Sequence, residues 1–246
     1  MTGTIELTVA SYNIHKGVGA VWRRDLKRIT AVIGEIGAEI IALQEVDLRF
    51  GTRVGLLELE ALNMHLHLVH VPVPGGGLAH GWHGNQLLLR EGTVEEVHHL
   101  TLPGLEPRGA VIVDLAIRHR ALRVVAAHFG LLPASRRQQS RAILEHLDRL
   151  SPRPTLMMGD LNEWRTDRES SLAPLTEHFR SAPLVRSFPA RFPILALDRI
   201  MAGAGAEVTD AAVHDTPLAR RASDHLPIKA RLVLPARQRS DHRAAS

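Results

Sequence analysis

Residues 155–162 read Thr-Leu-Met-Met-Gly-Asp-Leu-Asn, an apolar run that ends in a carboxylate and an amide. The apolar part is typical of a buried strand, and the polar end is typical of a loop mounted on a rigid scaffold. Asp160 and Asn162 are two residues apart, so their side chains point to the same side of extended backbone. The stretch therefore predicts a sheet strand whose end carries functional groups.

The same arrangement recurs along the chain, because other apolar, strand-like runs also begin or end in polar residues. Carboxylates bind Mg²⁺, amides orient phosphate or water, and imidazole stabilises charge on phosphoryl oxygens. Together with Asp160 and Asn162 these residues form a set suited to binding a metal and a phosphate. The further members are Asn13, Glu45, His128, Asp198, Asp224 and His225.

Periodicity predicts many strands and few helices in a single domain. Two packed sheets flanked by helices are the architecture that buries such elements. We expect this domain to span residues 1–234, followed by a basic tail at 235–246. Ser135 and Gln138 fit a capping box at the start of one helix. The expected helices are 23–37, 53–64, 135–150 and 174–179; the expected strands are 6–14, 39–43, 65–71, 85–90, 93–99, 110–118, 122–129, 155–161, 195–201, 207–211 and 226–234.

Composition limits the chemistry. The 246 residues contain no cysteine, which excludes disulfides and thiolate metal sites and favours Mg²⁺, Mn²⁺ or Ca²⁺ on oxygen or imidazole ligands. The formal net charge of +4 suits an anionic substrate, but it is too small to indicate nucleic acid by itself. We find neither a signal-peptide pattern nor an apolar run of membrane-spanning length, so we expect a cytoplasmic protein without a transmembrane segment.

Seven motifs resemble, in order, those of the endonuclease/exonuclease/phosphatase superfamily, in a compact bacterial branch. Any one of them is common by chance, whereas seven in the family order over about residues 9–233 are not. They are Ser-Tyr-Asn-Ile-His (11–15), Leu-Gln-Glu-Val (43–46), Gly-Asn-Gln-Leu-Leu-Leu-Arg (84–90), the histidine motif at His128, Gly-Asp-Leu-Asn (159–162), Leu-Asp-Arg-Ile (197–200) and Ser-Asp-His-Leu-Pro (223–227).

The resemblance implies an α/β fold of the deoxyribonuclease I type. This is a four-layer α/β sandwich in which helices flank two packed, mostly antiparallel sheets, with the active site at one end of the sheets. It also implies divalent-metal-dependent hydrolysis of a phosphoester, most often a phosphodiester, by in-line attack of water with Mg²⁺ or Mn²⁺ as cofactor.

Roles carried over from the resemblance fall into two groups. Glu45 would be the main metal ligand, with Asn13 and Asp224 nearby. Asp160 would orient or deprotonate the attacking water, and Asn162 would help to hold metal or phosphate.

The remaining roles concern the phosphate. His225 would contact the scissile phosphate, and Asp198 would orient the ring of His225. His128 would contact a non-bridging oxygen or assist the leaving group. Asn85 is a candidate substrate contact within the Gly-Asn motif.

The sequence departs from the family pattern at Gln86 and Leu89, which stand where alanine and serine are expected. It also offers no match for the active-site tyrosine of apurinic endonucleases, which disfavours lesion-specific repair. Nucleic acids, phospholipids and small phosphoesters stay open as substrates, and no obligate protein partner is evident. An aromatic content of 4% slightly disfavours a dedicated single-strand nuclease.

Two other functions stay open, a phosphomonoesterase of the same family and a binding module that kept the fold and lost the chemistry. A calcineurin-like metallophosphatase would need an early Asp-x-His pair, which this sequence lacks. Nearby residues receive simpler interpretations. We expect Arg136, Arg137 and Arg141 to form a solvated helix face, and Trp164 to pack beneath the site.

Overall fold

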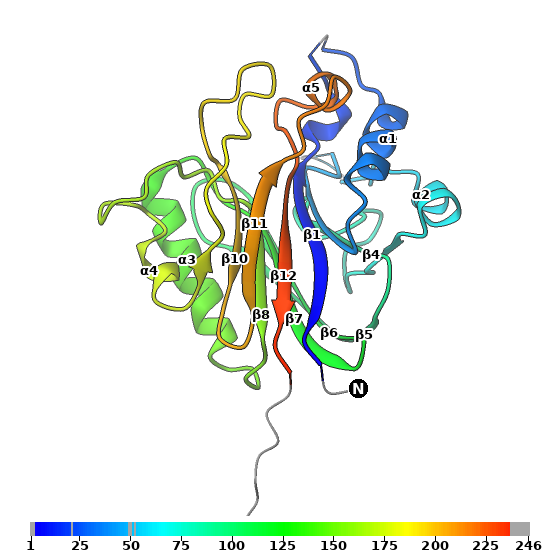
Figure 1. Ribbon diagram of the computed structural model, residues 1–246. Helices are drawn as coiled ribbons and strands as arrows, with labels where there is room; N and C mark the ends of the chain where they lie inside the picture. Colours follow the sequence, from blue (N-terminus) through cyan, green and yellow to red (C-terminus); the bar gives the residue numbers. More distant parts are fainter. Residues whose placement is uncertain (1–2, 21, 49–50, 52, 237–246) are drawn as a thin grey trace, which may run out of the picture.

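Two six-stranded sheets pack against each other in the computed structural model, which describes residues 3–20, 22–48, 51 and 53–236 (Figure 1). Within each sheet one neighbouring pair is parallel, β1 with β2 and β7 with β8, and the other pairs are antiparallel. The tail expected at 235–246 lies outside the described residues from position 237 onward.

The first sheet has the order β11-β12-β1-β2-β4-β3 and the second β5-β6-β7-β8-β10-β9. Strands of the first sheet are β1 (Ile5–Asn13), β2 (Ile40–Gln44), β3 (Val69–His70), β4 (Gln86–Leu89), β11 (Glu207–Val213) and β12 (Ile228–Leu234). Strands of the second are β5 (Thr93–Leu102), β6 (Arg108–Ile117), β7 (Arg120–His128), β8 (Thr155–Asp160), β9 (Arg180–Ser181) and β10 (Asp198–Ala202).

Helices cover the outer face of each sheet, which completes the four layers. On the first sheet lie α1 (Leu26–Ile36), α2 (Leu59–Leu66) and α5 (Ala219–Ala222); on the second lie α3 (Pro133–Leu147) and α4 (Ala173–Thr176). A short 3₁₀ helix, η1 (His15–Gly17), follows β1. None of the described helices is long and apolar enough to cross a membrane.

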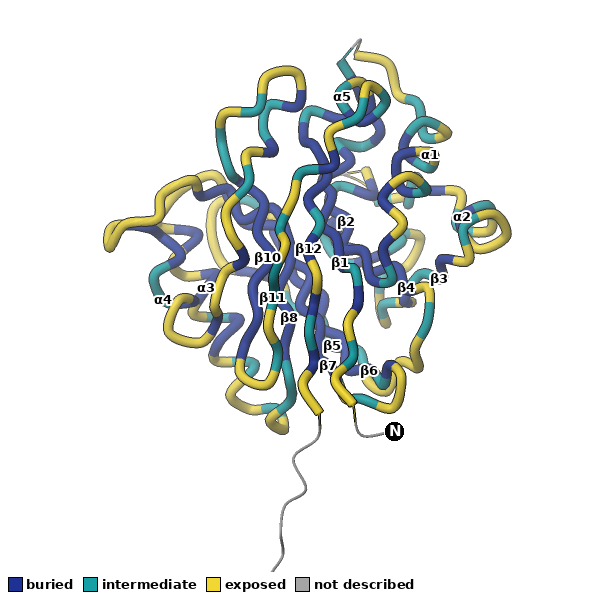
Figure 2. The backbone as a smooth tube through the Cα atoms, viewed as in Figure 1, coloured by how far each residue is buried: buried dark blue, intermediate teal, exposed yellow. Residues whose placement is uncertain are grey.

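Burial on both faces explains why the central strands are almost continuously apolar. In β1, Val9 packs into the core between the sheets, whereas Tyr12 packs into the core beneath α1. Met158 of β8 enters the core between the sheets, and Met157 faces the helices of the other layer. Figure 2 shows the result, with buried strands at the centre and exposed backbone on the loops.

Local chemistry sets several boundaries. Asp25 caps α1 by accepting a hydrogen bond from the backbone N–H of Arg28, and Gly37 ends the helix in the left-handed region at φ 66°. Gly159 has no tolerable substitute, because a Cβ there would lie 1.8 Å from the carbonyl oxygen of Ala127 on β7. This contact lets β8 approach β7 closely where the functional residues begin.

Three predicted boundaries were wrong. The second helix begins at Leu59 instead of 53, and its last turn takes positions assigned to a strand, which shrinks to Val69–His70. The third helix begins at Pro133, whose fixed φ and missing N–H suit a first helical turn. Ser135 therefore lies inside the helix and makes no capping box, and the cap residue Leu132 has no side-chain hydrogen bond.

Strand register brings the polar strand ends to one end of the molecule, here called the site end. His128 pairs with Asp160, and Asp160 pairs with Asp198, across three adjacent strands of the second sheet. In the first sheet Asn13 pairs with Gln44, the residue before Glu45. Both sheets therefore place their candidate functional residues at the same end.

Candidate active site

A pocket of about 390 Å³ opens at the site end and collects seven of the predicted residues from both sheets. Apolar side chains form part of its wall, among them Leu131, Trp164, Phe188, Leu195 and Leu197. The predicted residues that line it are Asn13, Glu45, His128, Asp160, Asn162, Asp224 and His225.

His225 lies between two carboxylates at the base of this pocket. Its Nδ1 donates to Asp198 Oδ2 at 2.9 Å, and its Nε2 lies 3.6 Å from Asp160 Oδ2. Ser187 donates its hydroxyl to the same oxygen of Asp198, and the ring of Phe188 lies 4.8 Å from the imidazole between centroids. Asp198 is therefore placed to fix the orientation of the ring, while Nε2 faces the pocket.

Charge and burial oppose each other in this group. Burial alone would lower the pKa of His225, but the carboxylates of Asp198 and Asp160 outweigh it and raise the pKa to about 10. Burial raises the pKa of Asp160 to about 6, against the lowering effect of His225. An imidazolium thus lies beside a carboxyl group that can exchange a proton near neutral pH.

Asp160 is held by the amides on either side of it. Asn13 Nδ2 donates to Asp160 Oδ2 at 3.0 Å, and the backbone N–H of Asn162 donates to Oδ1 at 3.0 Å. Asn162 has a left-handed backbone at φ 53°, and its own side chain donates to the carbonyl of Phe129. Such backbone strain in a non-glycine residue persists where the surrounding structure fixes it, which is common at functional sites.

Glu45 forms the other side of the pocket and already carries a positive partner. The ammonium group of Lys16 contacts its carboxylate, and His15 Nδ1 lies 3.6 Å from Asp224 Oδ1. Burial would raise the pKa of Glu45, but the contact with Lys16 outweighs burial and lowers it. The position is therefore built to hold a carboxylate in its charged form beside a cation.

This donor set fits a hard divalent cation. Asn13, Glu45 and Asp224 offer amide and carboxylate oxygens, which are the ligands Mg²⁺ and Mn²⁺ prefer. The Lys16 ammonium marks the place beside Glu45 where positive charge is stabilised.

A second trio of possible ligands lies deeper. One ligand atom each from Asp160, Asp198 and His225 lies within 4.8 Å of the others. However, the 2.9 Å hydrogen bond between Asp198 and His225 Nδ1 already uses the groups that would face an ion. This trio is better described as an oriented, charged imidazole than as a metal cage.

Two further residues at the site were not predicted from the sequence, one lining the pocket and the other beside it. Arg108 is 8% exposed, begins β6, and places Nη1 2.8 Å from His128 Nε2, while its Nη2 donates to Glu106 at 2.8 Å. Lys16 was the second. The sequence feature that could have indicated Arg108 is its position at the start of a strand. The next residue of that strand, Gly109, pairs with His128.

Asn85, the predicted substrate contact, lies outside the pocket. It is fully buried and does not line the pocket, because its side-chain amide donates to the backbone carbonyls of Trp82 and Gly109. These bonds tie the glycine-rich loop at 72–84 to the second sheet. Asn85 thus lies behind the edge of the pocket, and its contact with a substrate stays a prediction.

Two neighbouring expectations were also wrong. Arg136 is 2% exposed, and it donates to Glu163 Oε2 at 3.1 Å and to Ser171 Oγ at 2.7 Å, so it is no solvated helix residue. Trp164 is 54% exposed at the pocket mouth instead of packing beneath it. The Arg136–Glu163 pair anchors the loop that follows Asn162 to α3.

Comparisons with known proteins agree with this geometry. The protein YbhP of Escherichia coli K12, itself uncharacterised, is 29% identical over 259 positions that cover 95% of this chain and 98% of that protein. A Beutenbergia cavernae endonuclease/exonuclease/phosphatase structure superposes with a TM-score of 0.70 at 23% identity, covering 94% of this chain and 72% of the other. A Bacteroides thetaiotaomicron mannosyl-6-phosphatase superposes with a TM-score of 0.72 at 17% identity, covering 92% and 99%.

The Beutenbergia and Bacteroides structures share the fold of this chain, which confirms the predicted four-layer α/β sandwich. The family model of the Endonuclease/Exonuclease/phosphatase family matches residues 10–225, which include all the pocket residues described above. The chain therefore belongs to the endonuclease/exonuclease/phosphatase family, whose members hydrolyse phosphoester bonds.

Proposed function

We propose that this protein is a divalent-metal-dependent phosphodiesterase. The observation that carries the proposal is the imidazole of His225, held by Asp198 at 2.9 Å and facing a pocket that also presents Glu45 and Asp224. An oriented imidazolium beside a set of oxygen ligands matches the needs of phosphoryl transfer, in which charge spreads over non-bridging oxygens.

We assign a role in hydrolysis to each polar side chain of the pocket. Asp160, whose pKa is raised to about 6, accepts the proton of the attacking water, and Asn13 and Asn162 hold its carboxylate in place. His225 donates from Nε2 to a non-bridging oxygen, and Arg108 and His128 bind the phosphate from the opposite wall. Mg²⁺ or Mn²⁺ held by Asn13, Glu45 and Asp224 would neutralise charge on the phosphate.

The apolar wall favours a diester. Leu195 and Leu197 border the phosphate-binding groups, which gives organic substituents on the phosphorus a surface to contact. A phosphomonoesterase is the second candidate, since Arg108 and Lys16 together would favour a dianionic phosphate. The structural likeness to a mannosyl-6-phosphatase makes this candidate worth testing.

One assay separates these functions. Protein stripped with EDTA is given Mg²⁺ or Mn²⁺ and tested on bis-p-nitrophenyl phosphate and on p-nitrophenyl phosphate, with Glu45→Gln as the matched control. We expect metal-restored hydrolysis that favours the diester and is lost in the variant. Preference for the monoester would replace the diesterase by a phosphatase, and full activity in EDTA would remove the metal.

A further inference from the structure

Large exposed apolar side chains are concentrated at the site end. Scattered exposed apolar residues are ordinary on any protein, but a concentration beside a pocket indicates a contact surface. Of fourteen such side chains in the described part of the chain, ten lie on loops at the site end: Trp22, Leu48, Val54, Leu78, Leu105, Leu131, Leu132, Trp164, Phe192 and Ile194.

Three segments at this end form one continuous ridge, here called the crest: residues 22–28, 190–194 and 214–222. The backbone N–H of Ala20, just before the first segment, donates to the carbonyl of Arg221 at 3.3 Å. Arg220 Nη1 in turn donates to the carbonyl of Arg191 at 2.9 Å. In Figure 1 the crest runs across the top, through α5 and the loops on either side of it.

The crest carries its aromatic side chains at its two flanks. Trp22 is 84% exposed and Phe192 is 74% exposed, with Ile194 half exposed beside it. Aromatic side chains that project from loops commonly insert into a membrane at the level of the lipid headgroups. This layer lies between the apolar interior of the membrane and water.

Positive charge surrounds these side chains. The crest contains seven basic residues and two acidic ones. Both acidic residues are paired within the crest, Asp25 with Arg28 at 3.6 Å and Asp215 with Arg220 at 2.6 Å. The crest therefore presents a net positive field to any surface that faces it.

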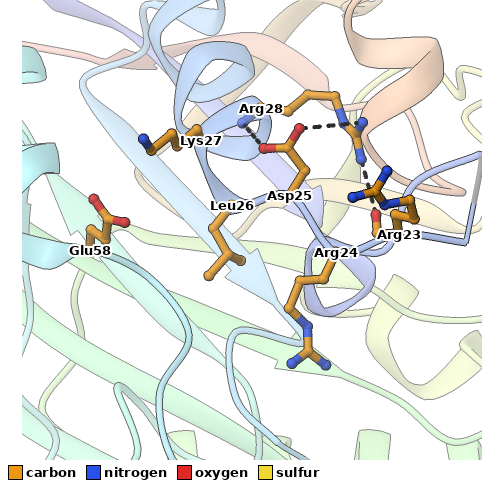
Figure 3. Close-up of a pocket in the computed structure, with 7 residues that line it drawn as sticks. All are labelled: Arg23, Arg24, Asp25, Leu26, Lys27, Arg28 and Glu58. Carbon is orange, nitrogen blue, oxygen red and sulfur yellow. Dashed lines mark hydrogen bonds and ion pairs between the residues drawn. The ribbon is translucent and has the colours of Figure 1, made fainter.

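The first crest segment borders a shallow hollow of about 630 Å³ at the start of α1 (Figure 3). Arg23, Arg24 and Lys27 line it with exposed side chains, and Asp25 is turned to Arg28. Among the described residues that line the hollow, Glu58 is the one acidic group from outside the crest. The hollow is wide enough for an anionic headgroup.

The crest is joined directly to the catalytic pocket. Arg24 Nε donates to the carbonyl of Lys16, the residue whose ammonium contacts Glu45. On the other flank, the backbone N–H of Ala190 donates to the carbonyl of Asp224, and Ile194 precedes Leu195 in the pocket wall. A surface that contacts the crest therefore also covers the pocket mouth.

We propose that the crest docks on a bilayer surface containing anionic phospholipid and so presents the pocket to phosphodiesters at that surface. Basic side chains at the interface attract anionic headgroups, while Trp22, Phe192 and Ile194 enter the headgroup layer. A bilayer is favoured over nucleic acid because aliphatic side chains such as Leu131 and Ile194 are exposed around the mouth beside the aromatic ones, and aliphatic groups gain from an apolar layer but cannot stack on bases.

Docking is tested without turnover. Full-length protein in EDTA is sedimented with vesicles of phosphatidylcholine alone and with vesicles containing about one third phosphatidylglycerol. We expect binding to the anionic vesicles that weakens as salt is raised. The double variant Trp22→Ala, Phe192→Ala should bind roughly tenfold more weakly or worse. Met64→Ala changes an apolar residue on α2 that is 67% exposed and lies outside the crest; it is the control and should bind as the parent does.

The docking proposal deepens the proposed function and rests on it for the hydrolysis of a phosphodiester. The outcomes of the experiment distinguish failure of docking from failure of catalysis. Equal binding to neutral vesicles, or unchanged binding by the crest variant, overturns the docking surface. So does a crest variant that loses affinity for duplex DNA and not for vesicles. Hydrolysis of soluble bis-p-nitrophenyl phosphate should be unchanged in the crest variant; its absence in the parent protein overturns the catalytic proposal and leaves the docking result standing.

Discussion

His225 is the central side chain of the proposed mechanism. Its two nitrogens face different partners, Asp198 at 2.9 Å and the pocket beside Asp160, so the ring is both oriented and charged. A histidine stabilises developing charge well only when its ring is held and its protonation is secured. The burial of all three groups is what makes their mutual electrostatic effects large.

Removing the imidazole should therefore be costly. We expect His225→Ala to lower kcat by roughly 10²–10³, the scale for losing one preorganised electrostatic group. Asp198→Asn should lose as much or less, because it keeps the shape and weakens the charge pairing. Steady-state kinetics of both single variants and of the double variant test this pairing. If the two residues act as a unit, the loss of kcat in the double variant is far smaller than the product of the two single losses. A kcat loss in the folded double variant that equals the product of the single losses would contradict the pairing of His225 with Asp198.

Lys16 provides a second prediction at this scale, because its ammonium contacts the carboxylate proposed as the main metal ligand. Lys16→Met should tighten Mg²⁺ binding about five- to tenfold, since a cation no longer competes for Glu45 and such pairs contribute on the order of 1 kcal/mol. Calorimetric titration with Mg²⁺ measures it. Lys16→Arg, which keeps the charge, is the control, and equal affinities in all three proteins would place the metal away from Glu45.

At the scale of elements, β8 and α3 together position the loop that bears Asn162. β8 ends at Asp160, and the buried pair Arg136–Glu163 ties the following residues to α3. Ser171 adds its backbone N–H and hydroxyl to the same carboxylate. The loop that bears Asn162 is thereby fixed at both ends.

Breaking this pair should destabilise the fold. Arg136→Met leaves a buried carboxylate without its guanidinium, so we expect a loss of about 3–5 kcal/mol in the free energy of unfolding. Arg137→Met, the next residue on an exposed part of α3, should change it by less than about 0.5 kcal/mol. Urea unfolding of the two variants makes the comparison, and equal stabilities would show that the pair is not needed.

Glu163 also predicts a pH dependence. Burial would raise its pKa, but hydrogen bonds from Ser171, Arg165 and Arg136 outweigh burial and lower it from 4.5 to about 2. A carboxyl group whose pKa is depressed by folding contributes stability above its unfolded pKa and loses it as pH falls through the folded value. The stability difference between the parent and Glu163→Gln should therefore shrink between about pH 4.5 and pH 2. Urea unfolding of both proteins across this pH range measures the difference. A stability difference that stays constant across the range would contradict the lowered pKa of Glu163.

At the scale of the whole molecule, the proposed metal ligands come together only when both ends of the chain have folded. Asn13 ends β1, Glu45 follows β2, and Asp224 precedes β12, at the other end of the sequence. The pairing of β1 with β12, which aligns Ser11 with Ile228, brings them to one place. A ligand that binds this site binds the native state and not the unfolded chain.

Mg²⁺ should therefore stabilise the fold. At about a hundred times its dissociation constant, a ligand specific for the native state adds about 2.7 kcal/mol, which corresponds to roughly 5–10 °C in Tm for a chain of this size. Thermal unfolding with and without Mg²⁺ measures the shift. Glu45→Gln should remove most of it, and a parent Tm that stays fixed at Mg²⁺ concentrations supporting hydrolysis would contradict the site.

Some of this protein follows from the sequence because the determining physics is local or repetitive. Alternating and continuous apolar runs place the strands, and polar residues at strand ends mark the site, since both depend on neighbours in the chain. This pattern singles out eight residues, and all of them except Asp198 line the candidate pocket: Asn13, Glu45, His128, Asp160, Asn162, Asp198, Asp224 and His225. The order of the motifs added what no single residue could, namely the fold that brings them together.

The rest was decided by tertiary contacts. A lone arginine on a helix is exposed by default, and only the packing of α3 against the loop at Glu163 buries Arg136. Arg108 lines the pocket and Lys16 lies beside it because distant strands and a left-handed turn place them there, with Lys16 at φ 55°. Asn85 turns inward because backbone carbonyls of Trp82 and Gly109 lie within its reach. Sequence patterns report which residues share an element, whereas burial and partner choice depend on contacts between residues far apart in the chain.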